Sequence, residues 1–203
     1  MFQTIVKIFL LVIITAAITP FIRKLAFVLG AVDNPNARRI NKKPMPTIGG
    51  LAIFVAFNIG EFVLLRKDFP THELFSVLLA SSVIILTGLI DDILELKPRQ
   101  KMFGIFVASL VVYFLAGIKV RELSLPFLGH IQLGWWSFPL TIFWILALTN
   151  AVNLIDGLDG LATGVTLISL VTMGIVGFFF LKSWQHYVPI MCIMLAACLL
   201  GFL

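Results

Sequence analysis

The sequence predicts an all-α protein, a polytopic bundle of helices embedded in a membrane, with one short β-hairpin outside it. Of the 203 residues, 60% are apolar and only 12% are charged, whereas an average soluble domain is about 25% charged. A compact soluble domain of this length has too little interior to bury so much apolar surface. The charged residues also interrupt the chain at intervals that suit a bilayer, which a helix crosses with about 20 apolar residues.

Seven almost uncharged stretches are each expected to form one transmembrane helix. They are residues 4–22, 47–65, 74–90, 102–118, 137–155, 160–181 and 187–203. Lys7 and Glu61 fall within two of them but near an end, from which a long side chain can reach the interface. Cys192 and Cys198 lie in the last stretch, where we expect buried structural thiols. Residues 1–203 are therefore expected to form a single integral membrane domain.

The distribution of lysine and arginine predicts the orientation of this domain. The loops 23–46 and 91–101 hold six and three basic residues, against two, two and one in the loops 66–73, 119–136 and 182–186. Cytoplasmic loops are enriched in basic residues. The first two loops are therefore expected to face the cytoplasm, with the N-terminus on the outer side.

One of the predicted outer loops has the pattern of a short β-hairpin. Apolar and polar residues alternate over 123–125 and again over 131–133, with Gly129 in the turn between them. Trp135 and Trp136 then mark the membrane interface at the start of the fifth stretch.

Two acidic clusters stand at the predicted cytoplasmic ends of helices. Asp91 and Asp92 follow the third stretch, and Asp156 and Asp159 follow the fifth. Both helices run inward, so these carboxylates lie at helix C-termini, where the helix dipole disfavours negative charge by up to about 1 kcal/mol. Two such unfavourable placements on one face suggest a site that holds a cation.

The ligand types favour Mg²⁺ as this cation, with Mn²⁺ as an alternative. Asn150 and Asn153 extend the acidic pattern in steps of three along the fifth stretch, so that their amide oxygens share one helix face with the carboxylates. Mg²⁺ binds a few carboxylates and leaves its other positions to water and phosphate oxygens. The histidines at positions 72, 130 and 186 fall in predicted outer loops, which argues against zinc.

Each charged cluster also has a purely structural interpretation. Asp91, Asp92 and Glu95 could form a solvated loop that the basic residues at 97, 99 and 101 balance. The polar residues of the fifth stretch could be a helix end broken by glycines. The basic loop either binds anionic lipid headgroups or pairs with substrate phosphates. Its candidate side chains are Arg38, Arg39, Lys42 and Lys43.

Three motifs follow one another along nearly the whole chain. They are Val32-Asp33-Asn34-Pro35 with Pro46-Thr47-Ile48-Gly49-Gly50, then Gly88-Leu89-Ile90-Asp91-Asp92, then Asn150-Ala151-Val152-Asn153-Leu154-Ile155-Asp156-Gly157-Leu158-Asp159-Gly160-Leu161. Together they resemble the polyprenyl-phosphate N-acetylhexosamine-1-phosphate transferase family. The first motif is more similar to the branch that uses UDP-N-acetylglucosamine than to the branch that makes the peptidoglycan lipid precursor. Asn41 and Ile105 depart from the family, which often has His and Gln there.

The resemblance implies a multi-pass bacterial plasma-membrane enzyme whose active site faces the cytoplasm. Such an enzyme transfers N-acetylglucosamine 1-phosphate from UDP-N-acetylglucosamine to undecaprenyl phosphate with Mg²⁺ and releases UMP, as the first membrane step of a cell-surface polymer pathway. Asp91, Asp92 and Asp156 match its catalytic residues, with Asp92 and Asp156 toward the metal. Asn153 and Asp159 are expected to orient the nucleotide sugar. The lipid phosphate, largely a dianion at pH 7, would be the nucleophile, and Asp91 its proton acceptor.

Other functions remain open at this point. A phospho-N-acetylmuramoyl-pentapeptide transferase would share the motifs. An ion-coupled transporter would instead place its ionisable residues near the bilayer midplane. A CDP-alcohol phosphotransferase would need Ala-Arg at positions 163–164, and a purely structural membrane subunit would need no chemistry. No nucleic acid partner is expected, and a homodimer is left open. Because family members continue further, residues 1–203 are expected to be a truncated form that is inactive alone.

Overall fold

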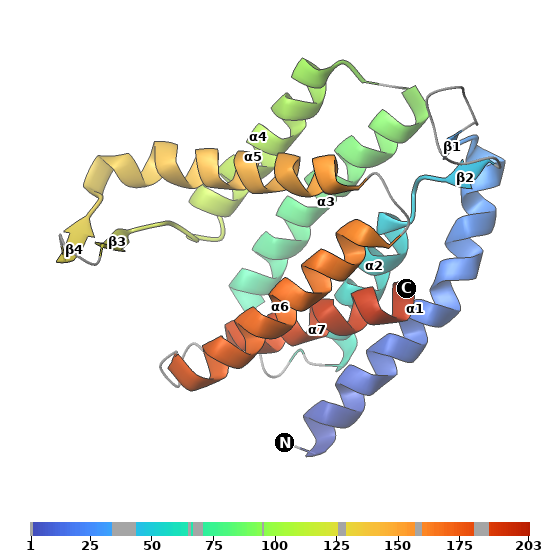
Figure 1. Ribbon diagram of the computed structural model, residues 1–203, viewed down its shortest axis with the longest axis horizontal. Coiled ribbons are helices and arrows are strands. Elements are labelled where there is room, and N and C mark those ends of the chain that lie inside the picture. Colours follow the sequence, from blue (N-terminus) through green and yellow to red (C-terminus); the bar gives the residue numbers. More distant parts are fainter. Residues whose placement is uncertain are drawn as a thin grey trace.

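The computed structural model describes residues 2–33, 44–64, 66, 71–94, 96–125, 129–156, 160–180 and 187–203. Within these ranges the chain forms seven α-helices and two small antiparallel strand pairs (Figure 1), which confirms the all-α fold class. The helices are α1 (Phe2–Leu29), α2 (Gly50–Ile59), α3 (Thr71–Leu94), α4 (Pro98–Phe114), α5 (Ser137–Ile155), α6 (Leu161–Phe180) and α7 (Tyr187–Phe202). A π-helix, η1 (Gly60–Leu64), continues α2, and a 3₁₀ turn, η3 (Gly134–Trp136), precedes α5.

Each of the seven apolar stretches overlaps one of these helices. In the described part of the chain, four helices are long and apolar enough to cross a membrane, namely Thr4–Leu29, Leu74–Leu94, Gly134–Ile155 and Leu161–Phe180. Gly50–Val63 and Tyr187–Phe202 are apolar but shorter, and α4 has 17 residues. The chain is thus built as a membrane protein.

Gly30 ends α1 and turns the chain toward the first strand pair. Its φ of +72° is in the left-handed region, and the amide of Ala31 donates to the Ala26 carbonyl at 3.0 Å, the pattern of a glycine C-cap. β1 (Val32–Asp33) then pairs with β2 (Met45–Pro46). The pair brings the two ends of the basic loop together, while the loop residues 34–43 themselves lie outside the described residues.

The predicted β-hairpin is confirmed at the far end of α4 and α5 from that strand pair (Figure 1). β3 (Glu122–Leu125) and β4 (Gly129–Gln132) are antiparallel, and every residue in them is exposed. Two cross-strand side-chain hydrogen bonds join them: Gln132 Nε2 donates to Glu122 Oε2 at 2.9 Å, and Ser124 Oγ lies 2.8 Å from His130 Nδ1. The hairpin is therefore held by polar contacts rather than by an apolar core.

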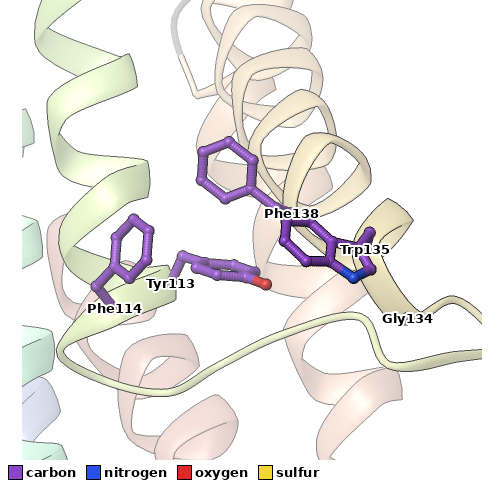
Figure 2. A pocket seen from close by; sticks show the side chains of 5 residues that line it. All are labelled: Tyr113, Phe114, Gly134, Trp135 and Phe138. Atoms are coloured by element: carbon purple, nitrogen blue, oxygen red, sulfur yellow. The ribbon is translucent and has the colours of Figure 1, made fainter.

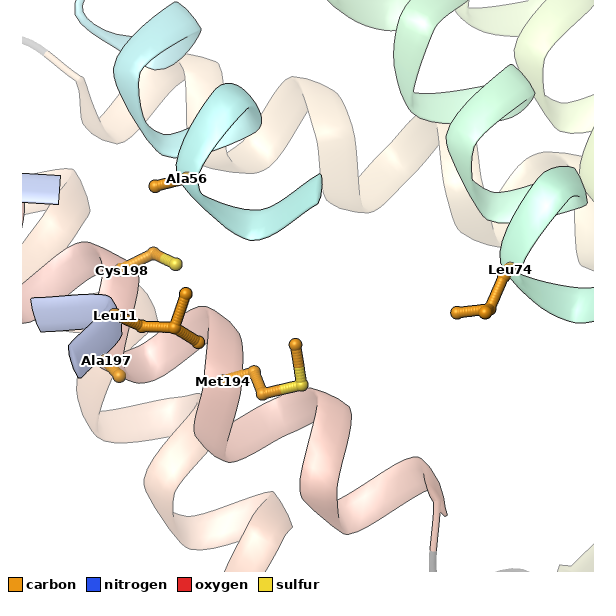
Figure 3. Packing of buried hydrophobic residues seen from close by; sticks show 6 residues of the cluster. All are labelled: Leu11, Ala56, Leu74, Met194, Ala197 and Cys198. Carbon is orange, nitrogen blue, oxygen red and sulfur yellow. The ribbon is translucent and has the colours of Figure 1, made fainter. Parts of the chain in front are cut away.

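The main core lies where α1, α2 and α7 meet (Figure 3). Small residues let these helices approach closely, which is what drives helix association inside a membrane. A Cβ on Gly60 would come within 2.9 Å of both Leu11 and Met194. The buried cluster consists of Leu11, Ala56, Leu74, Met194, Ala197 and Cys198. Cys198 is thus buried and Cys192 partly buried, and both are free thiols.

A second packing unit places α4 against α3 on one side and α5 on the other. At Gly104 of α4 the approach to α3 is so close that a Cβ would overlap the side chain of Thr87. The amide of Lys97 donates to Gln100 Oε1 at 2.9 Å, and Pro98 occupies the first turn of α4, both of which favour a helix start here. The first turn of α4 therefore lies beside the last turn of α3.

Candidate active site

The Asp pair lies in the last turn of α3, where both side chains are partly buried. Asp91 accepts a hydrogen bond from the amide of Leu96 through Oδ1, at 3.1 Å. That bond satisfies a backbone donor just beyond the helix end and fixes the orientation of the carboxylate. The second oxygen of Asp91 is left to face α4.

Lys101, in the first turn of α4, joins the two acidic motifs. Its Nζ donates to Asp91 Oδ2 at 2.8 Å and to Asn153 Oδ1 at 3.0 Å. The side chains of Lys101 and Asp91 are 27% and 21% exposed, so the ion pair itself adds little stability. Its importance is positional, because one ammonium group connects α3, α4 and α5 at a single point.

Asp92 links the segment that follows β2 to this site. The Thr47 hydroxyl, just after β2, lies within hydrogen-bonding reach of the Asp92 carboxylate and of the Ala31 carbonyl, the latter at 3.0 Å. With one proton, it can donate to only one of them at a time. Asp92 also interacts electrostatically with Asp91, Lys101 and Asp156. The base of the basic loop is thereby anchored next to the Asp pair.

The third motif reaches the site from the end of α5. Asp156 follows the helix as its C-terminal cap residue and is exposed. One turn and two turns earlier, Asn153 contacts Lys101, and Asn150 Nδ2 lies 2.8 Å from Met102 Sδ. α6 starts after Gly160, whose φ of +75° is in the left-handed region. The predicted polar face of the fifth helix therefore points at α4.

The structure assembles part of the predicted site. Asp91, Asp92, Asn153 and Asp156 gather at one end of the bundle. The other predicted residues lie outside the described residues: Arg38, Arg39, Lys42, Lys43, Asp159 and Glu95. Among the described residues, no three His, Cys, Asp or Glu side chains are close enough to hold a metal ion, so the metal site stays a prediction.

Sequence reasoning missed two residues of this site, Lys101 and Thr47. Lys101 was counted only as a charge that balances its loop. Its position in the first turn after Pro98 could have indicated a role in the site, because the start of a helix limits the directions in which such a side chain can point. Thr47 stands within a recognised motif, but its reach to Asp92 depends on packing between elements distant in sequence.

A separate pocket lies at the hairpin end of the molecule (Figure 2). It has a volume of about 510 Å³ and is lined by Tyr113, Phe114, Gly134, Trp135 and Phe138. Lys119 Nζ lies 4.4 Å from the centre of the Tyr113 ring. Tyr113 is twelve residues from Lys101, or about 18 Å along the axis of α4. This aromatic pocket is therefore distinct from the acidic site and offers none of its carboxylates.

The apolar helices and the cluster of carboxylates, an amide and a lysine at one end of the bundle define the class of this protein. It is an integral membrane protein with a charged site at one end of its helix bundle. The family described as glycosyl transferase family 4 matches residues 74–203. The chain belongs to this family, which confirms the resemblance seen in the motifs.

Curated relatives agree with this assignment. The chain is 36% identical over 187 residues to a probable undecaprenyl-phosphate N-acetylglucosaminyl 1-phosphate transferase of Bacillus subtilis, covering 92% of this chain and 51% of the relative. It is 33% identical over 194 residues to a phospho-N-acetylmuramoyl-pentapeptide-transferase of Clostridium botulinum, covering 91% and 58%. A Bacillus velezensis transferase with that second name is 30% identical over 222 residues, covering 100% and 65%. The chain thus spans about half to two thirds of the length of these relatives.

Proposed function

We propose that this chain forms part of the active site of a transferase that moves a sugar 1-phosphate from a UDP-sugar to a polyprenyl phosphate and releases UMP. The observation that carries this proposal is the contact of Lys101 with both Asp91 and Asn153, at 2.8 and 3.0 Å. Two motifs that lie far apart in sequence therefore meet at the ammonium group of Lys101. The relatives whose names describe sugar-phosphate transfer support the same reaction.

The reaction joins two anions, and the described residues suit that task. The phosphate of the lipid acceptor is largely a dianion at neutral pH, so it attacks the sugar-bearing phosphorus of the UDP-sugar without a strong general base. Lys101 can exchange its protein partners for phosphate oxygens and offset their repulsion. Asp91 stands beside it, ready to accept a proton from an incoming monoanionic phosphate. Asn153 presents an amide to the nucleotide sugar.

A divalent cation is proposed as cofactor because the donor set is made of hard oxygens. The carboxylates of Asp92 and Asp156 repel each other, so a cation bound near both would relieve this repulsion. Mg²⁺ needs only one or two protein carboxylates and takes its other ligands from water and phosphate. When bound, it would neutralise charge on the diphosphate and on the departing UMP.

The sugar donor is proposed to be UDP-N-acetylglucosamine and the acceptor undecaprenyl phosphate, after the name of the Bacillus subtilis relative and the Asp33-Asn34-Pro35 sequence. The muramoyl-pentapeptide donor is the second candidate, because several relatives at 30–33% identity carry that name. The Asp-bearing end is proposed to face the cytoplasm of a bacterial plasma membrane, since the loops joined to it hold most of the basic residues.

The proposal is tested by UMP release in nanodiscs that contain undecaprenyl phosphate, with each of the two UDP-sugars and with and without Mg²⁺. Two proteins are compared: the 203-residue chain, and a chimera in which this chain replaces the matching half of the Bacillus subtilis relative. Mg²⁺-dependent UMP release from UDP-N-acetylglucosamine by either protein supports the proposal. A chimera that folds in the membrane but releases no UMP from either donor would refute it.

A further inference from the structure

Glu61 occupies an unexpected place in the fold. Its position near one end of an apolar stretch predicts a side chain that reaches the membrane interface, but this prediction is wrong. Glu61 lies in the π-helix η1 and is 0% exposed. The preceding residue, Gly60, packs against Leu11 of α1 and Met194 of α7. The wider turn of the π-helix places the carboxylate in the bundle interior rather than at its surface, and such turns often occur at functional sites.

The Glu61 carboxylate has no hydrogen-bond donor in the part of the chain that the structure describes. Both of its oxygens are buried without a partner among the described residues, and so is Asn58 Oδ1, three residues earlier on the same helix face. The amide nitrogen of Asn58 is already used, because it donates to the Phe54 carbonyl at 2.8 Å. Three oxygen acceptors are therefore buried in one region, and no described residue donates a hydrogen bond to them.

An isolated carboxylate in this position would be strongly unfavourable. Transfer of an uncompensated charge into an apolar interior costs several kcal/mol or more, and charged groups inside membranes are therefore neutralised or paired. We propose that Glu61 and Asn58 bind one small monovalent cation, either a proton or Na⁺, inside the helix bundle. Three acceptors without a donor match a positively charged ligand and would repel an anion.

The groups on the neighbouring elements do not supply this charge. The titratable and charged side chains that the structure describes here are Lys7, Arg23 and Lys24 of α1, His72, Asp91 and Asp92 of α3, Tyr187, Cys192 and Cys198 of α7, and Arg66, which follows η1. His72 is exposed, and none of these side chains donates a hydrogen bond to Glu61. Since none of the described residues supplies the compensating charge, we assign it to a bound ion.

This site is separate from the acidic site of the proposed transferase. Glu61 lies eleven residues beyond the start of α2 at Gly50, about 16 Å along the helix. Asp92 and Thr47 lie at the opposite end of that helix. The cation site consequently does not depend on the proposed function, and the two can fail independently.

The test is the thermal unfolding of the 203-residue chain in phosphatidylcholine nanodiscs, followed by helical circular dichroism. Melting is measured from mildly acidic to mildly alkaline pH in choline chloride and again in NaCl at equal ionic strength. Three proteins are compared: wild type, Glu61→Gln, and the control Glu122→Gln on the exposed hairpin. Glutamine has the size of glutamate and brings its own N–H donors, so it needs no cation.

We expect the wild type to lose stability in choline as the pH rises above the ordinary range of an exposed glutamate. The unfolded chain then releases its proton while the folded chain must keep one, so the unfolding equilibrium constant grows by up to about tenfold per pH unit. If Na⁺ is the ligand, NaCl restores the lost stability; if the proton is the ligand, NaCl has no effect. Glu61→Gln should show neither dependence, and Glu122→Gln should behave as the wild type.

Equal pH and sodium dependence of the wild type and Glu61→Gln would overturn the proposal. If Glu61→Gln does not fold, Glu61→Met, which removes the carboxylate at similar volume, replaces it with the same expected insensitivity. If neither variant folds, the wild type decides: unchanged stability in choline across the whole pH range would overturn the proposal.

Discussion

Gly104 of α4 is the position at which a single methyl group should disturb both the packing and the candidate active site. A Cβ at this position would overlap the Thr87 side chain of α3 more closely than real Cβ contacts allow. Thr87 cannot easily turn away, because its hydroxyl donates to the Val83 carbonyl at 2.7 Å. Gly104→Ala must therefore push α3 and α4 apart.

The expected cost follows from two opposing effects. Alanine is favoured over glycine inside a helix by about 0.5–1 kcal/mol, whereas an overpacked contact costs about 1–3 kcal/mol. Gly164 of α6 provides a matched control, because a Cβ there has no neighbour within 4 Å. Both variants gain the helix preference, so the difference between Gly104→Ala and Gly164→Ala isolates the steric cost of about 1–3 kcal/mol.

This difference is measured by thermal unfolding of the purified chain in nanodiscs, where 1 kcal/mol corresponds to about 2–4 °C for a chain of this size. Thr87→Ala in the Gly104→Ala background should restore most of the stability, because it removes the two outer atoms of the clash. The contact also lies one turn from Asp91 and three residues from Lys101, so their 2.8 Å ion pair should lengthen. If Gly104→Ala is as stable as Gly164→Ala, the close approach of α3 and α4 is wrong.

Three further outcomes follow from the site. Lys101→Met should lower UDP-sugar binding or UMP release by about 10- to 100-fold, since two charge-assisted hydrogen bonds are lost. Lys97→Met, an exposed control, should change both little. Binding is measured by calorimetry and turnover by the UMP assay. Asp91→Asn and Asp156→Asn should each reduce UMP release by the chimera at least about 100-fold without loss of membrane insertion, and near-normal turnover would contradict their role. Single cysteines at positions 97 and 130, in a background without native cysteines, should react with an impermeant thiol reagent from opposite sides of the membrane; labelling from the same side would overturn the topology.

The helices were predictable from sequence because both signals that define them are local. Long apolar stretches interrupted by charges set where each helix must lie, and each of the seven expected stretches overlaps one observed helix. Their ends were less predictable. α1 continues past Arg23 and Lys24 to Leu29, because the helix ends at the left-handed glycine rather than at the first charge. Charged side chains at a membrane surface do not end a helix.

The candidate site was predictable only where its chemistry is visible in a motif. The Asp pair and the polar face ending at Asp156 combine unusual residues at helical spacing, which is a local pattern. The strand pair β1–β2 has two residues on each side and is too short to show alternation. The partners of Lys101 lie 10 and 52 residues away in sequence. Such contacts depend on how α3, α4 and α5 pack, and no single stretch encodes that.

Glu61 and Asp91 show why the position of a charge in the sequence does not determine its role. Both stand close to an end of an apolar stretch, and a count of charges treats them alike. Asp91 lies in the last turn of an α-helix, where it is partly exposed and reached by Leu96 and Lys101. Glu61 lies in a π-turn that places it inside the bundle, where no described donor reaches it. Helix geometry therefore sets the difference between the two carboxylates. Asp91 is partly exposed and hydrogen-bonded at the end of an α-helix, whereas Glu61 is buried in the bundle and accepts no hydrogen bond from a described residue.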